Sequence, residues 1–253
     1  MDLQTIILVI IVGFFSGVIN TLAGNGSLLS LPLLMFLGLP ANIANGTNRI
    51  GILLQSIVAS SSFKHQKVLE TKSATRLTIP AVIGSLIGAQ LAVELNEVLM
   101  RQAIGAVLVV MFFLIILKPN AWIKGKTDEV KEKKGIMPIL IFFSIGFYGG
   151  FIQAGVGLFL LAALVLGAGY DLVKANALKV FIVLVYTIFA LSVFIFNGQV
   201  DYTLGFTLAI GNMLGAYVAA KYAVSWGASF IRYVLLVVIL FSAFELFGVI
   251  NLF

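Results

Sequence analysis

The sequence contains no cysteine and only one histidine, His65. The lack of cysteine excludes disulfides, thiol catalysis and thiolate metal sites. An enzyme acting inside the membrane would need paired acids, a Ser/His or Ser/Lys pair, or histidine and acid metal ligands within its spans. The predicted spans contain no such set, and His65 falls in a basic loop between two of them. We therefore expect neither an enzyme nor a bound metal or cofactor.

Charge is also scarce, since only 10% of the 253 residues are charged and 61% are hydrophobic. A soluble domain of this length would carry about 25% charged residues. Several apolar runs reach the roughly 20 residues that cross a bilayer, among them 77–93 with its flanks and 231–250. The chain is therefore predicted to be a membrane protein of many spans. Its net charge of +6 lies in loops between the spans, where anionic lipid headgroups explain it better than nucleic acid.

The chain repeats itself at a constant spacing of 131 residues. The matched positions are Gly24 with Gly155, Gly26 with Gly157, Gly38 with Gly169, Asn45 with Asn176 and Arg101 with Arg232. Glycine matches alone arise easily in such a composition, but matched asparagine and arginine do not. This periodicity indicates a duplicated unit. We predict a first repeat over 1–117, a cytoplasmic linker over 118–136 and a second repeat over 137–253.

Each repeat begins with a long apolar segment, 3–39 and 137–168. A continuous helix over the first would exceed about 45 Å, against a hydrocarbon core of about 30 Å. Glycines interrupt both segments near their middle, at 21–27 and 153–157. Each segment is therefore predicted to form a helical hairpin with a turn inside the membrane. Three ordinary spans follow in each repeat, at 43–62, 77–94, 99–117, 176–196, 203–221 and 231–250.

Loop charges predict how the segments cross the bilayer. If each hairpin enters and leaves on one side, most of the sixteen basic residues are cytoplasmic, whereas 197–202, which has none, lies outside. The two copies are then inverted, as in many secondary transporters. The predicted fold is an all-α polytopic membrane protein of two inverted repeats, with eight segments when each hairpin counts as one. We expect it in the plasma or inner membrane with both termini outside. No basic signal-peptide region precedes the first segment.

Two runs carry a resemblance to a known family. The run from Gly17 to Pro32, followed by the run from Ala44 to Arg49, resembles the TauE/SafE family of sulfite exporters, as do Gly146–Phe151 and Gly155–Phe159 in the second copy. The resemblance covers essentially the whole chain. It implies transport of sulfite, sulfonates or related organosulfur anions, usually outward, with proton coupling left open.

The chain also departs from the family pattern. Asn20 and Gly149 stand where relatives often carry an acid, and Asn25 interrupts the usual glycine run. These departures argue against proton coupling through those positions and make the pocket more favourable to an anion.

The glycine turns suit an anion for physical reasons. A turn between half-helices leaves backbone N–H groups unpaired at a positive helix start, and glycine lets a ligand approach them closely. Two such turns meeting near the centre could hold one oxyanion, with neutral amide and hydroxyl donors and two cations around it. The predicted substrate-binding residues are Asn20, Gly24, Asn25, Gly26, Ser27, Asn45, Asn48, Arg49, Gln153, Gly155, Gly157, Asn176 and Lys179.

Other interpretations of the same residues stay open. The turn glycines could serve close helix packing, as we expect of Gly84 and Gly88 and of Gly211 and Gly215. Arg49 and Lys179 could extend to the headgroups, and the paired asparagines at 45 and 176 could cap the spans that follow them. We predict a secondary transporter that exports a small sulfur-containing anion by alternating access, with a passive anion channel or facilitator as the alternative. Its partners would be the anion and the lipid bilayer, with proton coupling and a homodimer open.

Overall fold

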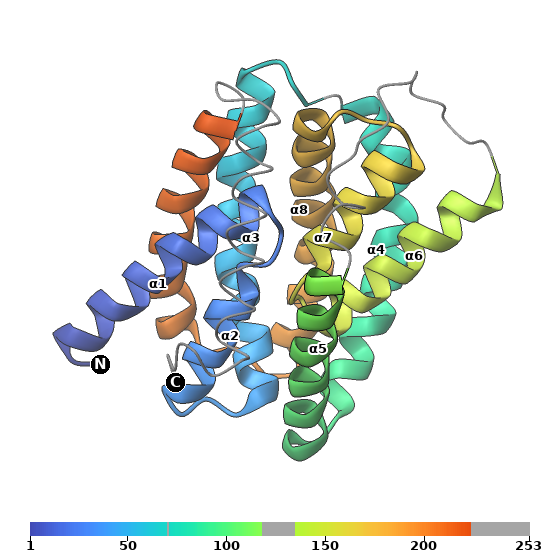
Figure 1. The fold of residues 1–253 in the computed structure, drawn as a ribbon. Coiled ribbons are helices and arrows are strands. Elements are labelled where there is room, and N and C mark those ends of the chain that lie inside the picture. The colour runs from blue at the N-terminus through green and yellow to red at the C-terminus, as the bar shows by residue number, and fades with distance from the viewer. Residues whose placement is uncertain (70, 118–134, 224–253) are drawn as a thin grey trace.

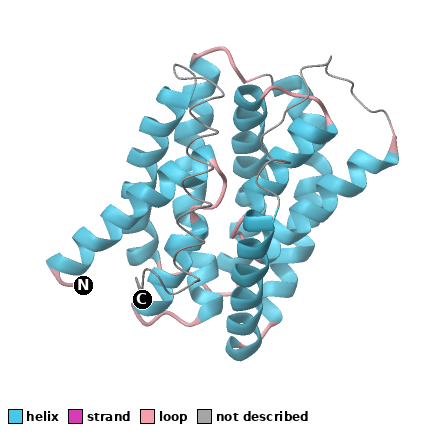
Figure 2. Ribbon diagram, in the orientation of Figure 1, coloured by secondary structure: helices cyan, strands magenta, loops and turns pink. Residues whose placement is uncertain are grey.

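The fold is given by a computed structural model, which describes residues 1–69, 71–117 and 135–223. Every regular element in these ranges is a helix (Figures 1 and 2). The helices are α1 (Leu3–Leu22), α2 (Ser27–Phe36), α3 (Ala41–His65), α4 (Thr71–Glu94), α5 (Glu97–Leu117), α6 (Ile136–Phe151), α7 (Val156–Ala162), the π-helix η1 (Ala163–Gly167), α8 (Leu172–Phe196) and the last described helix, Tyr202–Ala223.

Several of these helices can cross a bilayer. Four of the described segments are long and apolar enough: α1, the 75–94 part of α4, α8 and Tyr202–Ala223. Large apolar side chains such as Phe15, Ile83 and Leu214 are exposed on their outer faces, as lipid contact requires. The prediction of an all-α polytopic membrane protein is therefore confirmed. The predicted span at 231–250 and residues 118–134 of the linker lie outside the described residues.

Both long apolar segments are broken where the glycines predicted. α1 ends at Leu22 and α2 begins at Ser27, with Gly24 between them at a φ of +79°. α6 ends at Phe151 and α7 begins at Val156, with Gly155 between them at a φ of +76°. Because L side chains rarely adopt this left-handed backbone, glycine at these two positions allows the chain to reverse.

The two hairpins approach the centre from opposite ends of the molecule. In Figure 1, α1 and α2 open toward the end where α3 begins, whereas α6 and α7 open toward the end where α8 begins. α3 and α8 are antiparallel, since Gly46 near the start of α3 contacts Phe194 near the end of α8 and Gln199 in the turn that follows. This arrangement supports the interpretation of two inverted copies.

Matched backbone conformations also support the duplication. Three pairs of residues spaced 131 apart share a positive φ: Gly24 and Gly155, Gly38 and Gly169, and Lys67 and Gly198. The turns after α3 and α8 are closed by equivalent bonds as well. The Val68 N–H donates to the Phe63 carbonyl over 3.0 Å, and the Gln199 N–H donates to the Phe194 carbonyl over 2.9 Å. Residues without sequence identity, such as Lys67 and Gly198, thus occupy equivalent backbone positions.

Small residues bring helices of different predicted repeats into backbone contact. A Cβ on Gly84 or Gly88 of α4 would overlap the carbonyl oxygens of Phe143 and Phe147 in α6. The same packing recurs between α1 and the last described helix, where a Cβ on Gly211 or Gly215 would overlap α1 backbone. The expected packing role of these four glycines is therefore confirmed. Each contact is of the small-xxx-small type that drives helix association in membranes.

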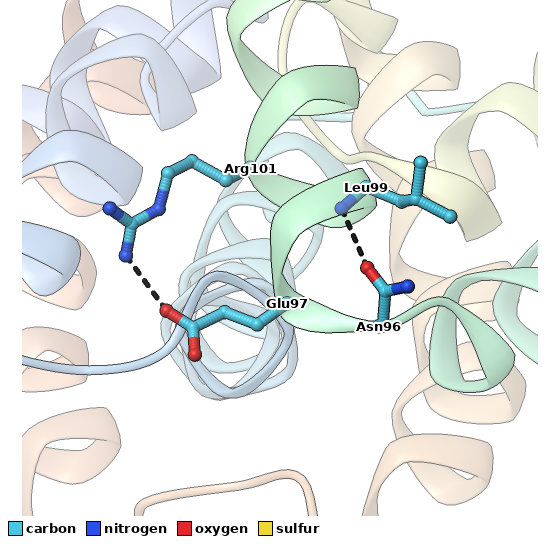
Figure 3. Close-up of polar contacts among 4 residues, drawn as sticks. All are labelled: Asn96, Glu97, Leu99 and Arg101. Carbon is cyan, nitrogen blue, oxygen red and sulfur yellow. Dashed lines mark hydrogen bonds and ion pairs between the residues drawn. The ribbon is translucent and has the colours of Figure 1, made fainter.

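The start of α5 shows the features of a helix end at an aqueous surface (Figure 3). The Asn96 Oδ1 accepts the Leu99 N–H over 2.9 Å and so caps the helix. Glu97 and Arg101, both well exposed, form an ion pair of 2.7 Å one turn apart. With the exposed Glu94, these residues mark an end of the α4 and α5 spans, as the sequence predicted.

The glycine contacts predict opposite effects for two alanine substitutions. Gly84→Ala forces α4 and α6 apart, so we expect it to lower the free energy of unfolding by roughly 1–3 kcal/mol. Gly105→Ala in α5 meets no atom of the described residues within 4 Å, so we expect no loss and a gain of up to about 1 kcal/mol from helix propensity. Unfolding in mixed micelles by added dodecyl sulfate measures both. Equal effects would contradict the α4–α6 contact.

The inverted arrangement predicts that Lys64 and Asn197 face opposite sides of the membrane. Both are exposed, and because the chain has no cysteine, Lys64→Cys and Asn197→Cys each introduce a single thiol. In intact cells an impermeant maleimide should label Asn197→Cys and leave Lys64→Cys unlabelled until the cells are opened. Labelling of both, or of neither, in intact cells would overturn the inverted topology.

Candidate functional site

The two hairpin turns touch each other at the centre of the molecule. A Cβ built on Gly24 would overlap the backbone of Gly157, and one built on Gly157 would overlap the Cα of Gly24. Gly26 is equally confined, because a Cβ there would overlap the carbonyl oxygen of Ser16. In this conformation the three glycines serve close packing. Their contact with a substrate stays a prediction that requires the turns to separate.

The first turn is bound to α3 by side-chain hydrogen bonds. The Asn48 Nδ2 donates to the Ser27 Oγ over 3.1 Å, and the Ser30 Oγ donates to the Asn48 Oδ1 over 2.6 Å. The Ser16 Oγ donates to the Gly26 carbonyl over 2.9 Å, which ties the turn to α1. Asn25 is buried between these groups, and neither atom of its amide has a partner among the described residues.

The second turn is held by Arg49, which is fully buried. One terminal nitrogen donates to the Gly149 carbonyl over 3.0 Å and to the Gln153 Oε1 over 3.2 Å. The other donates to the Gly150 carbonyl over 2.6 Å and to the Asn45 Oδ1 over 3.5 Å. The guanidinium therefore sits at the carboxyl end of α6, where the helix dipole is negative and a cation is stabilised.

Arg49 has little capacity left for a substrate. Its four terminal N–H groups are all used, only its Nε–H is without a partner, and the ring of Phe194 lies 4.6 Å from its central carbon. Among the described residues, Arg49 is compensated by backbone carbonyls and amide oxygens and not by a carboxylate. Arg49 is a positioning residue for the second turn in this conformation.

Further bonds fix the same turn to its neighbours. The Asn45 Nδ2 donates to the Phe151 carbonyl over 2.8 Å, and the Gln153 Nε2 donates to the Tyr186 hydroxyl over 2.7 Å. The Tyr148 hydroxyl donates to the Ala154 carbonyl over 2.6 Å. Gln153 thus has its amide oxygen on Arg49 and its amide nitrogen on Tyr186, which sets its orientation between α3 and α8.

Lys179 binds the helix end before the first turn, as Arg49 binds the helix end before the second. Its ammonium donates to the carbonyls of Asn20 and Thr21 over 3.1 and 2.7 Å, at the carboxyl end of α1. Arg49 of the predicted first repeat thus binds the broken helix of the predicted second repeat, and Lys179 of the second binds that of the first. An ammonium has three N–H groups, so one remains beyond these two bonds. Both cations are buried, so the interpretation that they extend to headgroups is wrong.

A small cavity of about 10 Å³ lies between the turns. Its lining consists of Asn20, Thr21, Gly24, Gln55, Ser56, Gln153, Gly157, Lys179, Val180 and Val183. That volume is about the room of one water molecule. A larger cavity of about 140 Å³ lies between α4, α6 and η1, but its wall is mostly apolar and includes no residue of either turn.

The cavity brings together five of the predicted residues and two that the sequence analysis missed. The predicted ones are Asn20, Gly24, Gln153, Gly157 and Lys179. Gln55 and Ser56 were missed because they are ordinary polar residues inside a span. A signal was present, since each follows a predicted residue of α3 by seven positions, which places them two turns along the same helix face.

The other predicted residues lie around this centre. Asn45 and Asn176 are buried within α3 and α8, so they do not cap those helices. The caps are Pro40 and Asp171, whose Oδ1 accepts two backbone N–H groups at 3.0 Å. The capping interpretation of the asparagines is therefore wrong. Within the described residues, no cluster of histidine, aspartate and glutamate could hold a metal ion.

The unequal bonding of the two cations predicts unequal losses of stability. Arg49→Met leaves two carbonyls and two amide oxygens without their arginine donors, so we expect it to lower the free energy of unfolding by about 3 kcal/mol or more. Lys179→Met removes only two such bonds, so we expect a loss of about 2 kcal/mol or less. Dodecyl sulfate unfolding of the purified variants measures both values. A larger loss for Lys179→Met would contradict the assigned roles.

Comparison with known proteins agrees with this architecture. The family model "Sulfite exporter TauE/SafE" matches residues 9–246. The "Probable membrane transporter protein ORF9" of Sinorhizobium sp is 27% identical over 93% of this chain and 90% of its own length. The "Probable membrane transporter protein YfcA" of Escherichia coli strain K12 is 30% identical over 90% of this chain and 84% of its own.

A further relative is aligned with this chain over nearly its full length. The "Probable membrane transporter protein YjnA" of Bacillus subtilis is 26% identical over 94% of this chain and 98% of its own. No solved structure matches. The family model spans nearly the whole chain and the relatives are named as probable membrane transporters, so this chain belongs to the TauE/SafE family of sulfite exporters.

Proposed function

We propose that this chain is a secondary carrier that exports a small sulfur-containing anion, which binds between the two hairpin turns. The observation that carries the proposal is the charge balance of the centre. Arg49 and Lys179 are both buried, while no aspartate or glutamate is buried among the described residues. Buried charges are costly unless they are compensated. Carbonyl dipoles supply part of that compensation, and an anion would supply the rest.

Lys179 is the group best placed to contact the anion. It faces the small cavity and keeps one N–H beyond its bonds to Asn20 and Thr21. Gln55 and Ser56 lie on the opposite wall and provide neutral donors. Sulfite and sulfonates have several acceptor oxygens, which an ammonium, amides and hydroxyls can bind together. The anion is not held too tightly, because it contacts Lys179 alone, whereas the terminal N–H groups of Arg49 are all bonded within the protein.

The size of the cavity supports a carrier over a channel. About 10 Å³ does not hold a sulfur oxyanion, so the turns must separate at Gly24 and Gly157 before the anion can bind. An open channel would leave a wider passage at this point. Inverted hairpins that meet at the centre suit rocking of one half against the other, which exposes the centre to each side in turn. Proton coupling and a homodimer stay predictions.

A binding experiment tests the substrate and the site together. The purified protein is heated with sulfite, taurine, benzenesulfonate, acetate or chloride, and its melting temperature is measured. A ligand at a hundred times its dissociation constant stabilises the folded state by about 2.7 kcal/mol. We expect a selective rise with a sulfur anion in the parent chain and in Lys64→Met, whose lysine is exposed. We expect no rise in Lys179→Met.

Transport in proteoliposomes separates the two mechanisms. If the protein is a carrier, vesicles loaded with unlabelled anion should take up labelled anion faster than empty vesicles, because the binding site returns to the outer face with an anion bound. A passive channel shows no such acceleration. Selective stabilisation by a carboxylate or halide alone, or one that Lys179→Met leaves unchanged, would overturn the proposed substrate or the proposed site.

A further inference from the structure

Beyond the small cavity, the contact between α3 and α8 carries buried polar atoms without partners. Ser60 lies one turn from Ser56 toward the end of α3, and Asn176 lies one turn from Lys179 toward the start of α8. Because the helices are antiparallel, both steps lead to the same end of the molecule. Ser60 is 6% exposed and Asn176 fully buried, and neither the Ser60 Oγ nor the Asn176 amide has a partner among the described residues. The Gln55 Oε1 is also buried without a hydrogen-bond partner among the described residues.

In the opposite direction along the same contact, hydrogen bonds hold the residues next to the cavity. There Gln153 is held by Arg49 and Tyr186, and the ring of Phe194 covers the guanidinium. Buried polar groups in native proteins are nearly always hydrogen-bonded, and each exception costs free energy. Other exceptions exist, since the Thr187 hydroxyl and the Gln199 Oε1 also lack partners among the described residues. Ser60 and Asn176, however, both lie between the cavity and the same end of the molecule, and their missing bonds are explained if that side becomes hydrated during the transport cycle.

The end to which this row leads is basic. Exposed cations gather there from the ends of four helices (Figure 1): Lys64 in the last turn of α3, Lys67 just after it, Arg76 in α4, Lys174 in α8 and Lys221 in the last described helix. Among the described residues, Asp171 is the one acidic residue at this end. Glu70, in the loop between α3 and α4, lies outside the described residues. The opposite end carries Glu94, Glu97 and Asp201. A cluster of one charge sign raises the local concentration of ions of the other sign.

We propose that the anion reaches Lys179 along the contact between α3 and α8, past Ser60 and Asn176, from the basic end of the molecule. This inference rests on the proposed anion carrier and adds the path and its direction. Opening separates the part of α3 after Ser56 from the part of α8 before Lys179. The bonded part around Arg49 and Gln153 stays closed during this step. The exposed basic residues gather the anion, and the Asn176 amide and Ser60 hydroxyl replace part of its hydration shell.

Single cysteines test the path in the chain as it exists, which contains no other thiol. Ser60→Cys is nearly isosteric, and Asn176→Cys serves as a second probe should the first fail to fold. The matched control is Thr187→Cys, since Thr187 is also fully buried with an unpartnered hydroxyl but lies on the other side of the cavity in α8. Lys64→Cys reports in the same vesicles which side the reagent reaches.

The reagents are two impermeant methanethiosulfonates, one with a sulfonate group and one with a trimethylammonium group. Their rates are normalised to a free thiol. From the side that labels Lys64→Cys, we expect the sulfonate reagent to modify Ser60→Cys or Asn176→Cys about tenfold faster than Thr187→Cys. With the cationic reagent, we expect the probes and Thr187→Cys to be modified at similar rates. Equal rates at the probes and at Thr187→Cys, or labelling from the opposite side only, would overturn the path. The readout needs no sulfur-anion transport, so it can succeed where the proposed substrate fails.

Discussion

The structure depends on two buried cations that each bind the broken helix of the other predicted repeat. Arg49 occupies the carboxyl end of α6 and Lys179 that of α1. A helix that ends inside a membrane leaves carbonyls that water cannot satisfy, so each break requires donors from elsewhere in the protein. A buried cation donates hydrogen bonds to these carbonyls and also offsets the negative end of the helix dipole. The breaks, the contact at Gly24 and Gly157, and the interlocked glycine helices all follow from meeting that requirement.

The two crossed contacts are alike in position but unequal in strength. The planar guanidinium of Arg49 uses all its terminal donors, whereas the ammonium of Lys179 keeps one. Arginine suits fixed, forked contacts, and lysine suits a point contact that can be exchanged. The proposed carrier would therefore keep the second turn fixed and release the contact of Lys179 with the end of α1. An anion that competes for Lys179 would loosen the carboxyl end of α1 and couple binding to movement.

The sequence predicted the breaks and most of the helices because glycine, apolar length and the 131-residue spacing are local signals. It did not predict the partners of Arg49 or Lys179, since those are backbone carbonyls about 100 and 160 residues away that any amino acid would supply. It missed Gln55 and Ser56 for a related reason, because only the fold brings them opposite Lys179. The substrate-binding role of the asparagines at 45 and 176 stays a prediction, and the capping alternative overlooked Pro40 and Asp171.

The central claim is that one anion binds between the turns at Lys179. Selenite replaces the sulfur of sulfite with a strong anomalous scatterer, so diffraction from crystals grown with selenite locates it directly. The account predicts one dominant anomalous peak between Gly24 and Gly157, within hydrogen-bonding distance of the Lys179 ammonium, with those glycines farther apart than here. A dominant peak elsewhere, with the two turns still in contact, would contradict it.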